Sequence, residues 1–284
     1  MRSIERRRST SVRQFFMVSM AFLAGMAAHP SGGMTYANER RFTYIYESPV
    51  LSPGARELEI WTTYRSGKSY YYHRLDQRIE LEFGVVDRLM TSLYLNYEWK
   101  MFDTNGDAPG GEKGSEQAAS VSTEWKYKVF DRVADPLGVA LYGEFTLGLD
   151  ERELEMKIIL DKQTGRFLLT GNLIAEQEWK NDLVNGIIEA GKELKLGISG
   201  GISYSVTSQF SFGVEAVQQS ILVGGAVEHA ALFAGPVISY ATEEWWATLT
   251  VLPQVVGLKG ETVDGLDLDE FERSQVRLLL SFHL

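Results

Sequence analysis

Residues 78–95, RIELEFGVVDRLMTSLYL, alternate between polar and apolar side chains twice, once on each side of a short break. Before GVVDR the odd positions are apolar and the even ones are charged; after it, Leu89, Leu93 and Leu95 restore the pattern. A period of two predicts two antiparallel strands joined by a tight turn, each with one apolar and one polar face. A soluble sheet protein hides its apolar face from water, whereas a transmembrane barrel presents that face to lipid.

The composition excludes several classes of protein and site. The chain of 284 residues has no cysteine, which excludes disulfides, thiolate metal sites and a cysteine nucleophile. Its four histidines leave little room for a multi-histidine metal centre. After residue 30, no apolar run approaches the roughly 20 residues of a membrane helix. The mean hydropathy of −0.14 is compatible with a β-barrel, because alternating strands average to a neutral value.

The first residues look like an export signal. Five arginines precede or flank the apolar run FFMVSMAFLAGMAA (15–28), and TYA (35–37) offers a cleavage site. We therefore expect a signal peptide at 1–37, an N-terminal segment at 38–54 and a barrel at 55–284. Removing the signal takes away five of 28 basic and one of 38 acidic side chains, which leaves a formal charge of −14. That charge argues against a nucleic-acid partner.

Extending the period of two along the chain predicts twelve strands. Every long connection follows an odd-numbered strand, as expected of short periplasmic turns and longer outer loops. The predicted fold is therefore an all-β, 12-stranded antiparallel transmembrane β-barrel in the outer membrane. The predicted strands are 55–65, 70–83, 89–100, 118–130, 138–149, 153–161, 166–180, 192–206, 209–219, 229–241, 245–257 and 271–284.

Aromatic residues on the apolar face gather near the strand ends, with aliphatic residues between them. This distribution is typical of the two aromatic girdles at a membrane's interfaces. The predicted girdle residues are Tyr64, Tyr97, Trp99 and Trp179 at the outer ends, and Phe83, Tyr127, Tyr204, Phe210, Tyr240 and Phe282 at the periplasmic ends.

The polar face carries charges of both signs, which we assign to the lumen. An Arg or Lys on the lipid face would cost roughly 2–4 kcal/mol at mid-depth. Either these charges line a pore, with Arg74, Arg78 and Arg277 as a basic strip, or they form a cross-strand network that stiffens a nearly occluded barrel. The main lumen-lining candidates are Glu57, Glu59, Arg74, Arg78, Glu80, Lys126, Glu144, Lys157, Glu176, Lys195 and Arg277.

Three points of the interpretation have alternatives. A secreted, soluble β-sandwich or barrel would show the same alternation turned inside out, although sandwich strands are usually shorter. Segment 38–54 is either a periplasmic tail, which we favour, or a lumenal plug suggested by the aromatics of FTYIY. Pro236 and Pro253 fall within predicted strands and indicate bulges or misplaced strand boundaries.

The sequence does not favour an enzyme. A barrel phospholipase needs a serine beside a histidine near the outer leaflet. His73 has the right height, but the predicted register places Thr62, Tyr64, Tyr97 and Trp99 beside it. NGDAPGG (105–111) lacks the acidic spacing of a calcium loop. We expect no catalytic residues, no metal site and no cofactor.

Several stretches resemble a family of Gram-negative outer-membrane barrels related to the transporter-like proteins of the phenol-degradation meta pathway. The resemblance is carried by residues 41–65, 78–100, 203–216 and 276–284. Its motifs include Pro53, Gly54, Glu57 and Glu59 in the opening strand and EFGVVDRL (82–89) in the first hairpin. It implies a channel or transporter embedded in the lipid bilayer and inserted by the outer-membrane assembly machinery. The chain ends on Leu284 instead of the usual aromatic residue.

Together these observations predict passive passage of a small solute, whose identity is open, through a narrow charged lumen. The alternative is a sealed structural or surface-interaction barrel that acts through its outer loops near 101–118 and 257–270.

Overall fold

The computed structural model describes residues 39–104, 112–184 and 187–284. Nothing is described for the predicted signal peptide or for NGDAPGG (105–111), so those two interpretations lie outside the described residues. Within the described chain, no helix is long and apolar enough to cross a membrane.

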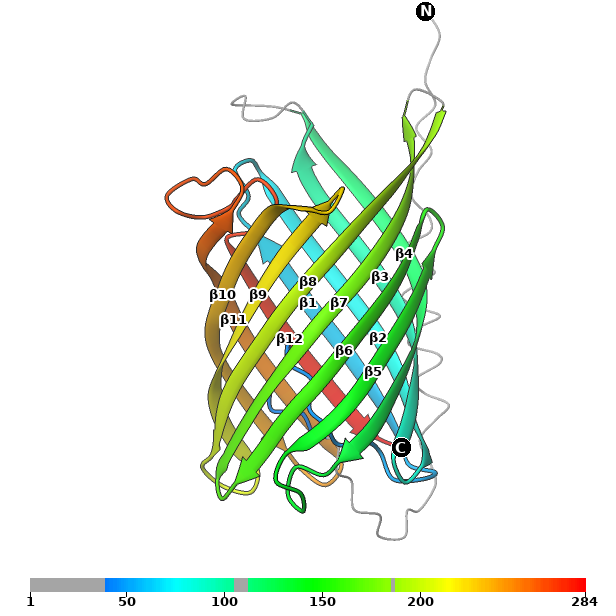
Figure 1. Ribbon diagram of the computed structural model, residues 1–284, viewed down its shortest axis with the longest axis vertical. Helices are drawn as coiled ribbons and strands as arrows, with labels where there is room; N and C mark the ends of the chain where they lie inside the picture. The colour runs from blue at the N-terminus through cyan, green and yellow to red at the C-terminus, as the bar shows by residue number, and fades with distance from the viewer. Residues whose placement is uncertain (1–38, 105–111, 185–186) are drawn as a thin grey trace, which may run out of the picture. The chain divides into compact units, whose positions relative to one another are not determined.

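Twelve antiparallel strands close into one barrel, in which each strand pairs with its neighbours in sequence and β1 pairs with β12 (Figure 1). The predicted fold class is therefore confirmed, and the soluble sandwich is excluded. The strands are β1 (Arg56–Ser66), β2 (Tyr72–Val86), β3 (Leu89–Asp103), β4 (Lys113–Phe130), β5 (Gly138–Gly148), β6 (Glu151–Thr164), β7 (Phe167–Val184), β8 (Ile187–Ser205), β9 (Phe210–Val223), β10 (Ala226–Ala241), β11 (Trp245–Lys259) and β12 (Ser274–His283).

Two of the expected long outer loops are largely strand. β7 and β8 continue to residues 184 and 187, and β9 and β10 meet at a turn formed by Gly224 and Gly225. Both glycines have positive φ, 60° and 86°, which residues with a Cβ rarely adopt. The sequence misplaced these ends because strands that project beyond lipid do not need an apolar outward face. The longest described connection on this side is 260–273.

Side chains alternate in exposure along each strand as the sequence predicted. Apolar residues such as Leu93, Val121 and Ile198 are 57%, 49% and 59% exposed on the outward face. Glutamates such as Glu57 and Glu80 are buried on the inward face. A protein in water would reverse this arrangement, because exposed aliphatic surface is unfavourable there. The outward surface is therefore built to meet lipid.

The two prolines sit in one interruption of the β10–β11 ladder. Pairing of these strands stops at Phe233 with Gln254 and resumes at Val237 with Thr250. Pro236 lies in the gap on β10 and Pro253 in the gap on β11. Because neither residue has a backbone N–H to donate, placing both in one gap confines the loss of ladder hydrogen bonds.

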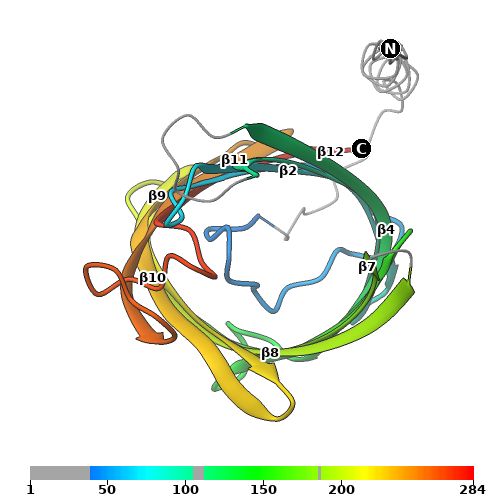
Figure 2. The same cartoon turned by 90° about the horizontal axis from the view of Figure 1, so that it is seen from above.

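The N-terminal segment lies inside the ring of strands, not below it. Figure 2 shows residues 39–55 crossing the interior of the barrel, and Figure 1 places them in the half that carries the short turns. Phe42, Ile45 and Leu51 in this segment are at most 1% exposed. The periplasmic tail favoured by the sequence is thus not what the structure shows for these residues.

Candidate functional site

The predicted lumen-lining residues all occupy inward-facing strand positions. Glu57, Glu59, Glu80, Lys126, Glu144 and Lys157 are buried, and the others are partly exposed. None lies on the lipid-facing side, as the energetic cost of such a charge requires. The interior of the barrel is therefore lined by charged side chains. The period of two predicts which strand positions carry them.

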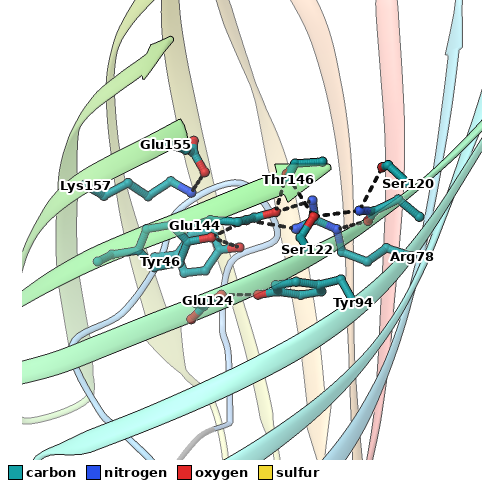
Figure 3. A network of polar contacts seen from close by, with 12 residues as sticks. Tyr46, Arg78, Tyr94, Ser120, Ser122, Glu124, Glu144, Thr146, Glu155 and Lys157 are labelled. Atoms are coloured by element: carbon teal, nitrogen blue, oxygen red, sulfur yellow. Dashed lines mark hydrogen bonds and ion pairs between the residues drawn. The ribbon is translucent and has the colours of Figure 1, made fainter. Parts of the chain in front are cut away.

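One polar network spans four strands of the barrel wall (Figure 3). Arg78 on β2 places its Nη2 atom 3.1 Å from Oε1 of Glu144 on β5 and donates from Nε to Asn96 on β3 at 2.8 Å. Asn96 donates at 2.8 Å to Ser122 on β4, which in turn is hydrogen-bonded to Thr146 at 2.8 Å. Such cross-strand contacts stiffen the wall, because each partner satisfies the other's buried polar group.

Aromatic rings complete this network toward the lumen. The guanidinium carbon of Arg78 lies 4.3 Å from the ring centre of Tyr94, and the Tyr142 hydroxyl donates to Glu144 at 2.5 Å. Lys157 places its Nζ atom 4.1 Å from the ring of Tyr46 and 4.0 Å from that of Tyr142. Cation–π contacts of this kind are strongest where water is excluded. Tyr46 belongs to the N-terminal segment, so the segment is part of the network (Figure 3).

A second row of charged side chains lies nearer the outer end, and its members form ion pairs with one another. Asp76 on β2 accepts from Arg65 on β1 at 2.8 Å and from Arg74 at 2.5 Å. Arg74 also contacts Glu98 on β3 at 2.5 Å, and Glu98 contacts Lys100 at 2.6 Å. The row contains three cations and two carboxylates, and each of these side chains has an oppositely charged partner.

A third group of charges joins β7 and β8. Lys195 lies 2.6 Å from Glu176 and 2.8 Å from Glu178. Glu178 also pairs with Lys180. The predicted candidates Glu176 and Lys195 are thus brought together, as cross-strand neighbours on one face should be.

The structure does not bring Arg74, Arg78 and Arg277 into one basic strip. Arg74 pairs with acidic residues of the outer row, and Arg78 pairs with Glu144. Arg277 lies 3.8 Å from the ring centre of Tyr44 and donates to the Thr63 hydroxyl at 2.8 Å. The guanidinium carbons of Arg78 and Arg277 share one neighbour, the Trp61 ring, at 5.2 and 5.6 Å from its centre, whereas Arg74 is paired in the outer row.

The N-terminal segment is attached to the wall through lumen-facing side chains. Asn172 on β7 accepts from the Tyr46 N–H at 2.7 Å and donates to the Tyr46 carbonyl at 2.9 Å. Glu215 on β9 accepts from the N–H groups of Thr43 and Tyr44 at 3.2 and 3.0 Å. These side chains satisfy backbone groups that an irregular buried segment would otherwise leave unpaired.

Further contacts hold the segment on other strands. Asp161 on β6 accepts from the Ser48 N–H at 2.9 Å and from its hydroxyl at 2.6 Å. Thr248 on β11 donates to the Arg40 carbonyl at 2.6 Å. Residues 39–55 form no strand, so they add no edge to the sheet. The segment is bound much as a ligand would be, by groups that converge from several strands.

Gly201 on β8 makes room for the apolar side chains of the segment. A Cβ at this position would lie 2.6 Å from Phe42 and 2.8 Å from Ile45. The two side chains pack with Leu168 and Val237 in a buried cluster. A larger residue at 201 cannot coexist with Phe42 in its present place.

The β4–β5 turn adds charged contacts at the periplasmic end. Arg132 forms ion pairs with Glu47 of the segment and, at 3.7 Å, with Asp161. In the same turn, hydrogen bonds from the N–H groups of Val133 and Ala134 lower the pKa of Asp131. The turn is thereby fixed beside the segment.

Arg40 is a site residue that the sequence analysis did not identify. Its side chain is 6% exposed and lies between the rings of Tyr46, at 4.3 Å, and Trp61, at 4.7 Å. Its Nη1 atom is 4.0 Å from Glu59 on β1. The sequence holds one signal for this role, since a basic residue precedes the aromatics of FTYIY.

The predicted girdle residues all lie at outward positions. Trp125, Phe145 and Phe212 are further outward aromatics that the prediction omitted; they are 50%, 44% and 50% exposed. The strand parity that identified the others would have found them. Of the predicted residues, Tyr64, Tyr127, Phe210, Tyr240 and Phe282 are exposed, whereas Phe83, Tyr97, Trp99, Trp179 and Tyr204 are partly exposed.

The register around His73 differs from the predicted one. Its cross-strand partners are Ser66 on β1 and Met101 on β3, so a serine does lie opposite this histidine. The Nδ1 atom of His73 is hydrogen-bonded to the Tyr64 hydroxyl at 2.5 Å. Among the described residues, Ser66 makes no side-chain hydrogen bond to His73, and the pair lacks the contact that activates a nucleophile.

The connection 260–273 folds against the outer end of the barrel interior. Gln254 on β11 accepts from the Asp267 N–H at 2.7 Å, and Phe271 packs on Phe233 with ring centres 6.0 Å apart. Tyr44 of the N-terminal segment packs against the same apolar cluster. The outer connection and the N-terminal segment thus approach each other inside the lumen.

The barrel is similar to several solved structures. An outer membrane channel from Pseudomonas putida F1 (COG4313) has a TM-score of 0.59 at 10% identity, covering 84% of this chain and 98% of that chain. The NanC porin has a TM-score of 0.50 at 15% identity, covering 80% and 100%. The β-domain of the Bordetella autotransporter BrkA has a TM-score of 0.51 at 8% identity, covering 82% and 100%. At these identities the likeness shows the fold, which is that of an outer-membrane β-barrel.

No curated protein matches this sequence. A family model does match, over residues 34–284, which include every strand of the barrel and the lumenal segment. The chain therefore belongs to the family described as a family of unknown function, DUF6662.

Proposed function

We propose that the protein is an outer-membrane channel for passive passage of a small polar solute, with the N-terminal segment as a removable plug. The observation that carries the proposal is the way residues 39–55 are held. They lie in a charged lumen and are bound by side chains of β6, β7, β9 and β11, without joining the sheet. Within the described residues, backbone–backbone hydrogen bonds from the segment to the sheet occur only at its last residues, where Gly54 and Ala55 bond to Gly84 of β2, so residues 39–53 can leave without breaking any ladder hydrogen bond of the wall.

The wall itself supports the same function. Its inward face carries acidic and basic side chains in cross-strand pairs, which water can solvate once the segment moves aside. A twelve-stranded barrel is narrower than the 16–18-stranded porins, so a peptide crossing its lumen is enough to obstruct it. The structural likeness to an outer membrane channel and a porin agrees with this role.

Gly201→Val tests the plug directly. The added side chain would displace Phe42 and Ile45, and the mature protein in planar bilayers should then conduct more often than the wild type. The matched control is Gly200→Val, because the neighbouring glycine faces outward and its Cβ would meet no atom closer than 3.7 Å. Electrical silence of a folded Gly201→Val barrel would contradict the proposal and would favour the sealed barrel that acts through outer loops.

Arg78 tests whether the network borders the path of ions. In the conducting Gly201→Val background, Arg78→Glu places a negative charge beside Glu144 and should shift selectivity toward cations. Reversal potentials across a salt gradient measure that shift. Unchanged selectivity would show that ions do not pass Arg78. The resemblance to barrels of the phenol-degradation meta pathway supports transport without naming a solute, which uptake assays with and without the gene would narrow.

A further inference from the structure

Four glutamates face one another across the periplasmic half of β1 and β2. In the β1–β2 ladder, Glu57 is opposite Glu82 and Glu59 is opposite Glu80. All four are buried, with exposed fractions between 0% and 4%. Like charges directly opposite each other on one face destabilise a sheet, and burial strengthens their repulsion. Something must compensate this ladder in the folded protein.

Partners within the sheet compensate one end of the ladder. Glu57 accepts from the Trp246 indole and from the Ser281 hydroxyl, both at 2.5 Å. His283 lies 3.4 Å from the same carboxylate. Glu57 is thereby tied to β11 and β12 and turned toward donors that the other three glutamates do not share.

The other end of the ladder converges on one point. Glu59, Glu80 and Glu82 each offer a carboxylate oxygen, and these oxygens all lie within 4.8 Å of one another. Two ligands of one calcium ion, each bonded at about 2.4 Å, are at most that far apart. The geometry therefore fits three monodentate ligands of a single ion.

Buried oxygens at this point have no hydrogen-bond partner among the described residues. They are Oε1 of Glu59, Oε2 of Glu80 and the hydroxyl oxygen of Ser92. Ser92 is not acidic; it lies on β3 directly opposite Glu82, on the same inward face, and is 0% exposed. An unsatisfied buried polar atom destabilises the folded protein, so its persistence points to a missing partner.

The cation of the N-terminal segment compensates only part of this negative charge. Arg40 approaches Glu59 at 4.0 Å, the limit of an ion pair, and its guanidinium lies between two aromatic rings. No ion pair to Glu80 is formed by the described residues. Arg78 and Lys126 also face Glu80 and Glu82, but neither forms an ion pair with Glu59 or Glu80 among the described residues, so these two carboxylates keep oxygens free for a divalent cation.

We propose that Glu59, Glu80 and Glu82 bind a hard divalent cation, with calcium as the best fit. Carboxylate oxygens are the ligands that calcium prefers, and the Ser92 hydroxyl and water would fill the remaining positions. Zinc fits less well, because it favours nitrogen and sulfur ligands and the cluster contains no histidine or cysteine. The ion would brace β1 and β2 beside Arg40.

Terbium luminescence provides the test, since Tb³⁺ occupies calcium sites and is sensitised by nearby indoles. Trp61 donates to Glu59 at 2.7 Å and would serve as the antenna. The folded mature protein in detergent, stripped with EDTA, should show indole-sensitised Tb³⁺ emission that Ca²⁺ displaces. Glu80→Gln should weaken binding roughly tenfold or more. Glu153→Gln, an inward glutamate of β6 outside the cluster, should bind like the wild type.

A second measurement distinguishes loss of the ion site from loss of the fold. Ca²⁺ should raise the thermal stability of the wild type and of Glu153→Gln, and should have little effect on Glu80→Gln or Glu59→Gln. Absence of sensitised emission from the folded wild type, or equal Tb³⁺ affinity in Glu80→Gln, would overturn the proposal and show that the carboxyls share protons instead. Neither result depends on conductance, so the channel proposal is tested separately.

Discussion

The inward faces of β1 and β2 are built differently at their two ends. Toward the outer end, Arg65 and Arg74 also face each other with the same charge, but Asp76 forms ion pairs with both, at 2.8 and 2.5 Å. Toward the periplasmic end, Glu59 and Glu80 face each other with the same charge. The same two strands therefore carry one row that is satisfied within the sheet and one row that is not.

The difference shows where the wall depends on groups outside it. The short ion pairs of the outer row lie within β1, β2 and β3, and one longer contact of 3.9 Å joins Arg65 to Glu272 in the connection 260–273. The glutamate row receives Arg40 from the N-terminal segment, and that side chain is 6% exposed between Tyr46 and Trp61. The plug therefore fits the end of the lumen where the wall has surplus negative charge. Electrostatic complementarity of this kind fixes the position of a bound segment more than it adds affinity.

The largest expected effect comes from removing the cation of the glutamate row. Arg40→Met should lower the free energy of unfolding by about 3 kcal/mol, because it leaves a buried carboxylate without its cation. Urea unfolding of the mature protein in lipid vesicles would measure it. Arg41→Met is the control, since Arg41 is also in the segment but makes no ion pair with the glutamate row. Equal losses of unfolding free energy for the two variants would show that the glutamate row does not depend on Arg40.

Breaking the outer row should cost less. Asp76→Asn removes the carboxylate shared by two guanidinium groups, and we expect a loss of about 2 kcal/mol, since hydrogen bonds to charged groups contribute on that scale. Glu98→Gln, which leaves Asp76 in place, should cost less than Asp76→Asn in the same urea titration. If Asp76→Asn were neutral, the outer row would not be the self-satisfied structure that its geometry indicates.

The smallest expected effect has the opposite sign. In EDTA, Glu80→Gln should raise the free energy of unfolding by up to about 1 kcal/mol, because it relieves repulsion from Glu59 across the ladder. In calcium buffer the wild type should have the higher free energy of unfolding. A destabilised Glu80→Gln protein in EDTA would show that the like charges are already compensated in the metal-free protein.

Much of the wall follows from the sequence because strand parity is a local property. The alternation in RIELEFGVVDRL places Arg78, Glu80 and Glu82 on one face, and the closed barrel confirms the twelve strands that this period predicts. The strand ends were less predictable. β7 and β8 extend past the apolar positions because backbone pairing does not require lipid contact.

Contacts between strands and segments depend on register, which parity does not determine. Ser66 lies opposite His73 because the β1–β2 connection spans 67–71, one residue longer than predicted and differently placed. The contacts of the N-terminal segment follow no sequence period, because Asn172, Glu215 and Asp161 bind it at irregular intervals. The aromatics of FTYIY were a signal for burial, but they did not specify what would bury them.

Thiol accessibility at Ser48 tests the lumenal position of the segment most directly. The chain has no cysteine, so Ser48→Cys introduces a single thiol at a site that is 0% exposed. A charged, membrane-impermeant maleimide should label it far more slowly than Ser208→Cys in the exposed β8–β9 turn, and Gly201→Val should speed the labelling. Labelling of Ser48→Cys as fast as Ser208→Cys in the otherwise unchanged barrel would contradict a plugged lumen.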